Sequence, residues 1–208
     1  MIDLPPIEKR IEEKFFLPKS KSYAFMSLIN NLDAKKLHPN RKVQSLYLDY
    51  NNTCFDDHVA GVFDRKKIRF RWYDENHNNT FLEIKKKISI FTIKEKKKVS
   101  NFNPNEKEIN KLLKKKFFWD ISSLSSSCYI FYDRSYFFLP KNNIRITIDD
   151  NLVFGASDKM MKKLNIASLI VELKYTESQN INQLYAILKI LNLELTKISK
   201  YIICKERL

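Results

Sequence analysis

The feature that most constrains this chain is the alternation of charged and apolar residues in several short segments. In LEIKKK, for example, Glu83, Lys85 and Lys87 stand at every second position, with Leu82 and Ile84 opposite. Residues two apart share one face of a β-strand, so each segment predicts a strand with one charged and one apolar face. The five charged faces are Arg10, Glu12 and Lys14; Arg69 and Arg71; Glu83, Lys85 and Lys87; Arg145, Thr147 and Asp149; Glu172 and Lys174.

For one strand alone, this pattern is that of an ordinary amphipathic sheet with its polar face in water. Its recurrence in five strands favours a sheet that closes with the charged faces inside. We therefore predict an α+β fold of mostly antiparallel strands, closed as an eight-stranded β-tunnel with flanking helices and a C-terminal helix. Closure would remove both exposed sheet edges. We expect residues 1–208 to form a single domain.

Outside the charged strands, apolar residues recur at helical spacing in three places. The predicted helices run from Ser20 or Ser22 to Leu32, from Asn105 to Phe118 and from Ser178 to Leu195. We expect a polar loop at NNTCFDD, which begins at Asn51, and a strand from Val59 to Phe63. A turn is expected at His77-Asn78-Asn79.

The net charge of +14 and the pI near 9.6 indicate a polyanionic partner. Lys, Asn and Ile are also what an AT-rich coding sequence produces, so the lysine count alone says little. The 8 arginines among the 38 basic residues say more, because most of them lie in or beside predicted strands. A guanidinium group presents a rigid fork of donors that suits phosphate oxygens.

Several classes of site are absent from the sequence. The 2 glycines cannot build a glycine-rich phosphate loop. The 3 cysteines lack any CxxC spacing and indicate reduced packing residues, and the 3 histidines lack metal-ligand spacing. No apolar run approaches the roughly 20 residues that span a bilayer, and the N-terminus lacks the apolar segment of a signal peptide. We expect a cytoplasmic protein without a membrane segment, and the pattern leaves its oligomeric state open.

The order of the segments RIEEKFF, SLYLD, GVFDRKKIRFRWY, LEIKKK, FYDRSYF, IRITIDDNLVF, VELKY and SKYI resembles the VTC domain. This family is the polyphosphate polymerase domain of the vacuolar transporter chaperone complex and its bacterial relatives, within the triphosphate tunnel (CYTH-like) superfamily. The resemblance runs from about Lys9 to Tyr201. It implies an antiparallel tunnel in which the γ-phosphate of ATP is transferred to inorganic polyphosphate with a divalent metal, Mn²⁺ or Mg²⁺.

The resemblance also implies roles for individual residues. The implied catalytic residues are Lys14, Arg69, Arg71, Lys85, Arg134 and Lys200. The implied substrate-binding residues are Arg10, Lys94, Lys96, Arg145 and Lys174. The implied metal ligand is Glu172, with Glu12 and Glu83 assisting. Purely structural roles also stay open for five of these residues. Glu172 and Lys174 would also suit a cross-strand ion pair, Lys200 a surface lysine, and Lys94 and Lys96 solvated charges on an edge strand.

The chain also departs from its relatives. We expect it to lack the N-terminal regulatory and membrane-spanning domains of the eukaryotic subunits. The acidic first-strand pattern ExExK of the wider superfamily is reduced to Arg10, Glu12 and Lys14. Because hydrolytic members use more carboxylates, this reduction weakens a hydrolase interpretation.

Four functions remain to be separated. The leading hypothesis is a polyphosphate polymerase. A triphosphatase acting on inorganic triphosphate or nucleoside triphosphates would use water as acceptor, and a non-catalytic module would only bind polyphosphate or triphosphate. The net charge alone would also allow a nucleic-acid-binding protein. No nucleic acid is expected, because charges inside a tunnel are buried whereas nucleic-acid patches are exposed.

Overall fold

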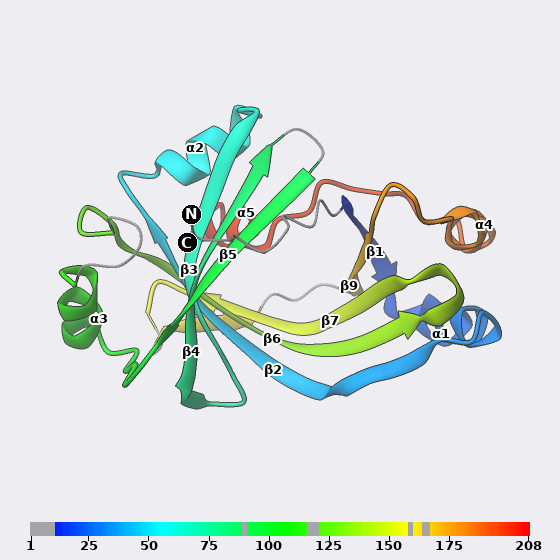
Figure 1. Ribbon diagram of the computed structural model, residues 1–208, viewed down its shortest axis with the longest axis horizontal. Helices are drawn as coiled ribbons and strands as arrows, with labels where there is room; N and C mark the ends of the chain where they lie inside the picture. Colours follow the sequence, from blue (N-terminus) through cyan, green and yellow to red (C-terminus); the bar gives the residue numbers. More distant parts are fainter. Residues whose placement is uncertain (1–10, 89–90, 116–120, 158–159, 164–166) are drawn as a thin grey trace, which may run out of the picture.

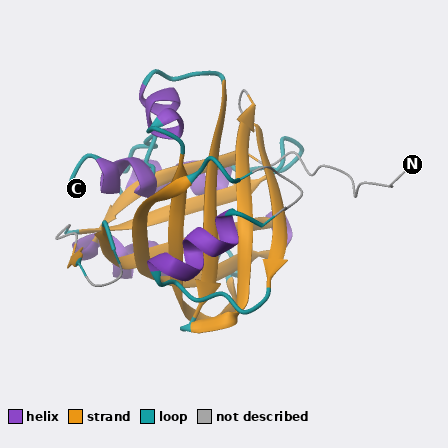
Figure 2. Cartoon of the chain, turned by 90° about the vertical axis from the view of Figure 1, so that its left-hand side faces the viewer, coloured by secondary structure: helices purple, strands orange, loops and turns teal. Residues whose placement is uncertain are grey.

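One curved antiparallel sheet forms the body of the molecule (Figure 1). The computed structural model of the chain describes residues 11–88, 91–115, 121–157, 160–163 and 167–208. Within them, nine strands form the sheet in the order β1-β9-β7-β6-β2-β3-β4-β5, and β8 pairs with β7. Figure 2 shows the strands curving around a common axis.

The elements follow one another along the chain in this order. They are β1 (Ile11–Pro18), η1 (Lys19–Lys21), α1 (Ser22–Asn31), β2 (Lys35–Asp49), α2 (Thr53–Val59), β3 (Asp64–Tyr73), β4 (Asn76–Ile88), β5 (Phe91–Val99), α3 (Glu106–Leu113), β6 (Ser125–Leu139), η2 (Pro140–Asn142), β7 (Ile144–Gly155), β8 (Met161–Lys163), β9 (Ser168–Tyr175), α4 (Asn182–Ile190) and α5 (Lys200–Lys205).

The predicted fold class is confirmed, with one correction to the way the tunnel closes. The two end strands of the sheet, β1 and β5, lie side by side, but no backbone ladder joins them in the described residues. Side chains meet near this seam instead, since Lys85 on β4 contacts Glu12 on β1. Within the described residues the tunnel therefore has nine strands, eight of them in one continuous path, and backbone hydrogen bonds do not join its two end strands.

Apolar side chains on the convex face of the sheet pack under three helices. Helices α1 and α4 lie next to each other and cover β1, β7 and β9, with Phe15, Phe25 and Leu173 fully buried between them. Helix α3 covers β2 to β5, where Phe70 and Trp72 are buried. Burying each such side chain contributes roughly 1.5–3 kcal/mol. The apolar faces are thus buried under helices on the outside of the sheet, which leaves the charged faces on the inside.

The C-terminal helix α5 takes a different position and packs inside one end of the curved sheet. Tyr201 stacks on Tyr47, with ring centroids 5.0 Å apart, and is buried beside Cys128. The Tyr201 hydroxyl donates to the carboxylate of Asp49, which also accepts the backbone N–H groups of Cys54 (2.9 Å), Phe55 (3.3 Å) and Tyr50 (2.7 Å). One buried carboxylate therefore joins β2, α2 and α5.

Helix α2 corrects two expectations. The segment expected as a polar loop is helical from Thr53 to Val59, and the strand expected from Val59 to Phe63 does not exist. The N-cap residue Asn52 has a left-handed backbone and makes no side-chain cap. The first-turn amides are satisfied instead by Asp49, three residues before the N-cap, so no local capping pattern reveals the helix.

The hairpin between β3 and β4 also turns earlier than expected. Tyr73 pairs with Asn76, so the turn is Asp74-Glu75 and not His77-Asn78-Asn79. Both turn residues have positive φ, 52° and 62°, as a two-residue type I′ turn requires. Nine non-glycine residues in the described chain have positive φ, and all except Glu75 are Asn or Asp. With so few glycines, Asn and Asp take the left-handed positions.

We predict that Asp49→Ala lowers the free energy of unfolding by about 3 kcal/mol, because it leaves three backbone amides and one phenol without their shared acceptor. Urea unfolding of the purified variant measures the loss.

The matched control is Asp56→Ala, an exposed acid in the first turn of the same helix. Its expected cost is about 0.5 kcal/mol from the helix dipole. Equal losses in the two variants would contradict the role assigned to Asp49.

Candidate functional site: a basic tunnel

The charged inner faces of the sheet enclose a cavity of about 760 Å³. Residues from β1 to β7, from α2, from β9, from the segment before α5 and from the start of α5 line it. Thirteen of the lining residues are Lys or Arg and three are Glu. The cations are Lys14, Arg65, Lys67, Arg69, Arg71, Lys85, Lys87, Lys94, Arg134, Arg145, Lys174, Lys197 and Lys200.

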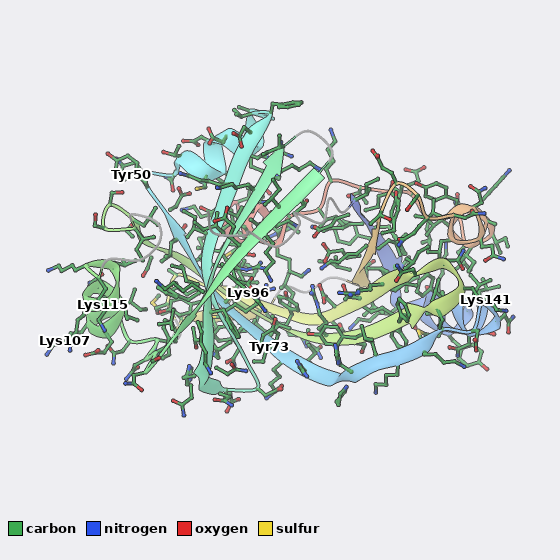
Figure 3. The ribbon with its side chains drawn as sticks, viewed as in Figure 1. Tyr50, Tyr73, Lys96, Lys107, Lys115 and Lys141 are labelled. Carbon is green, nitrogen blue, oxygen red and sulfur yellow. The ribbon has the colours of Figure 1, made fainter. Side chains whose placement is uncertain are left out.

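Not all of the positive charge of the chain lies in this cavity. Figure 3 shows Lys107 and Lys115 on and just after α3 at one end of the molecule and Lys141 at the opposite end. These lysines are exposed. The arginines divide differently, since five of the eight in the sequence line the cavity. The arginines are therefore concentrated on the inner face of the sheet, whereas the lysines are also spread over the outer surface.

At the centre of the cavity, Glu83 fixes the guanidinium group of Arg69. The Nε and Nη2 atoms of Arg69 donate to Glu83 Oε2 at 2.9 and 2.8 Å, and its Nη1 donates to the Tyr47 hydroxyl at 2.8 Å. Lys94 pairs with the other oxygen of Glu83 at 2.5 Å. Glu83 is 3 % exposed, so this carboxylate lies behind the cations and not among the lining residues.

Arg71 lies one step further along the same face of β3. Its Nε donates to Ser45 Oγ at 3.1 Å, its Nη2 donates to the Tyr132 hydroxyl at 3.0 Å, and Glu83 Oε2 is 3.9 Å from its Nη1. The pKa of Tyr132 is lowered because nearby Arg134 and Arg71 outweigh burial, which would raise it. Both guanidinium groups of β3 are therefore held in place by partners of their own.

A second buried carboxylate, Asp149, holds cations from β6 and α5. Arg134 forms a bidentate pair with it, at 2.5 Å from Nε to Oδ1 and 2.7 Å from Nη2 to Oδ2. Lys200 also pairs with Asp149, and its Nζ lies 4.7 Å from the centre of the Tyr132 ring. The first residue of α5 is thereby joined to the tunnel wall.

Glu172 on β9 differs from Glu83 and Asp149 because its contacts are looser. Its carboxylate lies 3.8 Å from Lys14 Nζ, 3.5 Å from Lys174 Nζ and 3.7 Å from Arg134 Nη2. Glu172 lines the cavity and makes no hydrogen bond with the described residues at normal distance. Glu12 on β1 is another carboxylate that lines the cavity, and it contacts Lys85.

The pKa directions follow from this charge imbalance. Burial raises the pKa of Glu83, but Arg69, Arg71 and Lys94 outweigh it and hold that pKa well below its usual range. The pKa of Glu172 is lowered in the same way, by Lys174 and Lys14 against burial. Conversely, burial lowers the pKa of Lys94 to about 8, which Glu83 partly offsets. The carboxylates are therefore ionised at neutral pH.

Sequence reasoning did not select six basic residues that line the cavity, which are Arg65, Lys67, Lys87, Lys197, His38 and His58. Lys67 lies on the face of Arg69 and Arg71 and donates to Ser199 Oγ at 2.6 Å. Burial and then Lys14 and Lys85 lower its pKa well below the usual range. His58 also lines the cavity, and burial followed by Lys67 and Arg65 lowers its pKa to about 4. The two-residue period that selected Arg69 could have selected Lys67 as well.

Thr147 was not selected as a site residue either, although the charged face to which it belongs was recognised. It is 6 % exposed, lines the cavity and is opposite Glu172 on β9 and Tyr136 on β6. Its hydroxyl is buried and has no hydrogen-bond partner among the described residues. A buried hydroxyl without a partner costs free energy in the empty protein, so a ligand oxygen could satisfy it.

The structure brings most of the predicted site residues together, with three differences. Arg10 lies outside the described residues. Lys96 does not line the cavity. Its Nζ lies 5.1 Å from the centre of the Phe81 ring instead. Glu83 lies beneath the cations. Arg145, the second residue of β7, is exposed and also lines the cavity. The remaining predicted residues, Lys14, Arg69, Arg71, Lys85, Arg134, Lys200, Lys94, Lys174, Glu172 and Glu12, all line the cavity.

The residues present fit a divalent cation only together with oxygens from a ligand. The described residues hold no group of three or more His, Cys, Asp or Glu placed to bind one metal ion. Glu172 and Glu12 offer carboxylate oxygens to the cavity, whereas both oxygens of Glu83 are taken by Arg69 and Lys94. One or two carboxylates plus phosphate oxygens are the usual ligands of protein-bound Mg²⁺.

We predict that Glu83→Gln lowers the free energy of unfolding by about 3 kcal/mol, because three cations lose their buried counter-charge. Thermal or urea unfolding measures the loss. The matched control is Glu95→Gln on β5, which pairs with Lys86 at 3.0 Å, where the side chains of Lys86 and Glu95 are 39 % and 37 % exposed. Its expected cost is under about 1 kcal/mol. A Glu83 variant as stable as the Glu95 variant would contradict this account.

We also predict that Thr147→Val leaves the free energy of unfolding unchanged or raises it by up to about 1 kcal/mol, since it removes an unpaired buried hydroxyl. Thr80→Val is the matched control, because the fully buried Thr80 donates to the His77 carbonyl at 2.8 Å. That variant should lose about 1 kcal/mol. A comparable loss in both would mean that the Thr147 hydroxyl has a partner in the free protein.

Comparisons with solved structures reveal the same fold at low sequence identity. The PH1819 protein from Pyrococcus horikoshii OT3 is 14% identical, with a TM-score of 0.57 over 96% of this chain and 99% of that one. A putative adenylate cyclase from Vibrio parahaemolyticus is 13% identical, with a TM-score of 0.58 over 94% and 97%. Another from Bacillus halodurans is 14% identical, with a TM-score of 0.58 over 91% and 93%.

No curated protein sequence matches the chain. Within the described residues, no helix has the length and apolar character needed to cross a bilayer. The sequence does match a family, the VTC domain, over residues 4–208. That match covers nearly the whole chain, including every strand that lines the tunnel. The chain therefore belongs to the VTC domain family and has the triphosphate-tunnel fold.

Proposed function

We propose that this protein is a polyphosphate polymerase that transfers the γ-phosphate of ATP to the end of an inorganic polyphosphate chain. The observation that carries the proposal is the cavity lined by thirteen Lys and Arg residues and three Glu residues. A narrow, strongly cationic interior suits a thin, linear polyanion better than a nucleic acid duplex, whose basic partners lie on exposed surfaces.

The fixed arginines supply the grip on the triphosphate of ATP. Arg69 and Arg71 point into the cavity with their guanidinium groups already held by Glu83, Tyr47 and Tyr132. Groups that are oriented before the substrate arrives need not reorganise as negative charge develops on the β–γ bridging oxygen of the departing ADP. Arg134 and Lys200, held by Asp149, extend the same arrangement across the tunnel.

Glu172, assisted by Glu12, would hold a divalent cation that bridges and neutralises phosphate oxygens. Lys14 and Lys174, both beside Glu172, would bind the phosphate oxygens that such a cation leaves uncovered. The loose contacts of Glu172 support this role, because its oxygens are not committed to short hydrogen bonds within the described residues.

The proposed reaction requires no strong general base, and His58, one of two histidines among the described residues that line the cavity, does not supply one. His58, which lines the cavity, has its pKa lowered to about 4 by burial and nearby cations and is neutral at physiological pH. The acceptor is a terminal phosphate that is largely ionised at neutral pH and can attack without losing a proton to the protein. Positioning and charge neutralisation are then the main contributions to catalysis.

We predict that the purified protein, given ATP, Mn²⁺ and a pyrophosphate primer, produces a ladder of polyphosphate on a gel. Arg71→Ala combined with Glu172→Ala should reduce the product by about 100-fold or more, since it removes one donor and the proposed metal ligand. The matched control is Lys66→Ala with Glu95→Ala, which removes one charge of each sign outside the cavity lining. It should retain the ladder.

Two results would overturn the polymerase. Release of phosphate without a ladder would indicate a triphosphatase. Retained binding of polyphosphate without turnover would indicate a binding module. Thermal melting of both double variants shows whether a lost ladder reflects a lost site or a lost fold.

A further inference from the structure

The α2 end of the tunnel has a group of cations that differs from those at its centre. Arg65 and Lys67 continue the row of Arg69 and Arg71 along β3, and Arg65 pairs in register with Lys87 on β4. At about 3.3 Å per residue, Arg65 lies about 13 Å along the strand from Arg69. We call Arg65, Lys67 and Lys87 the outer station. His58 of α2 lines the cavity beside it.

The outer station lacks the buried counter-charges found at the centre. Arg65 donates to the Val62 carbonyl at 2.8 Å and Lys67 to Ser199 Oγ at 2.6 Å, and both acceptors are neutral. Among the described residues, no carboxylate lies within ion-pair distance of the three cations of the station. Arg69 and Arg134, by contrast, each pair with a carboxylate that is almost fully buried.

Burial and then nearby cations disfavour the charged forms of Lys67 and Lys87. The pKa of Lys67 is lowered by burial and then by Lys14, Lys85, Arg65 and Arg69. The pKa of Lys87 is lowered by burial and then by Arg65, Lys85 and Lys197, against the single opposing charge of Glu12.

His58 shares these surroundings, and its Nδ1 is buried without a hydrogen-bond partner among the described residues. The fold therefore places Arg65, Lys67 and Lys87 in one half-buried group with no described carboxylate within ion-pair distance. An anion at this position would reduce the repulsion between these groups.

We propose that the outer station binds the part of a phosphate chain that extends beyond the triphosphate held at the centre. This inference rests on the proposed function of the tunnel. The row from Arg69 to Arg71 covers about 7 Å of the strand, and the outer station adds about 13 Å on the same face. A ligand that satisfies both must be a linear polyanion longer than the centre alone can hold. The chain would enter or leave through the mouth beside α2.

The test compares two ligands, inorganic triphosphate and a size-fractionated longer polyphosphate, by calorimetric titration of the whole chain. The variant is Arg65→Gln with Lys87→Gln. Its matched control is Lys66→Gln with Lys86→Gln, the next register pair on the same two strands, whose residues do not line the cavity. Both double variants lose the same formal charge. Ratios of variant to wild-type affinity are taken for each ligand, which cancels the larger number of binding registers on the longer chain.

We expect the Arg65 and Lys87 variant to bind the longer chain about tenfold more weakly and triphosphate less than about twofold more weakly. The Lys66 and Lys86 control should change neither affinity by more than about twofold. The retained triphosphate affinity also confirms that the variant is folded.

Equal weakening of both ligands would overturn the inference, since the outer cations would then belong to the triphosphate site. Unchanged affinity for both would overturn it too, since the chain would not reach them. A wild-type protein that binds the longer chain with the expected variant pattern but makes no polymer would overturn the polymerase and leave the outer station standing.

Discussion

Two buried carboxylates under a layer of cations support the whole interior of this protein. Glu83 and Asp149 are 3 % and 2 % exposed, and each holds an arginine and a lysine from different strands or helices. Buried guanidinium groups without counter-charge would repel one another and destabilise the tunnel. Because the two carboxylates lie behind the cations, they balance part of this charge and still leave the N–H donors of Arg69 and Arg134 facing the cavity. The same pairs therefore stabilise the fold and orient the site.

The contacts of α5 and of the segment before it help both to close the tunnel and to complete the site. The segment before α5 brings Ser199 to Lys67, and α5 brings Lys200 to Asp149, more than fifty residues away in sequence. Tyr201 anchors α5 on Asp49, which also holds the start of α2. Since the two end strands share no backbone ladder within the described residues, side-chain contacts such as that of Lys85 with Glu12 contribute to the closure. A change that loosens α5 would thus alter the cation layer directly.

The sequence predicts the inner faces well because a strand alternates with a period of two, and polar residues at that period need a common face. It does not predict which carboxylate lies beneath a cation and which one lines the cavity, since alternation specifies the face and not the partner. Glu83 was expected to assist a metal, yet both of its oxygens bind cations. Helix α2 was missed because its cap is Asp49, outside the usual position. The Asp74-Glu75 turn lacks the Asn-Gly or Asp-Gly signal of type I′ hairpins.

Two kinds of positive charge can be distinguished inside the tunnel, and they make different demands on folding. The charge of Arg69 and Arg134 is balanced internally, so its position is set before any ligand binds. The charge of Lys67 and Lys87 is not balanced by any described carboxylate within ion-pair distance, so it raises the free energy of the empty protein. An anion that binds both groups gains orientation from the first and relief of repulsion from the second. Ligand binding and fold stability are consequently linked most strongly where the counter-charges are missing.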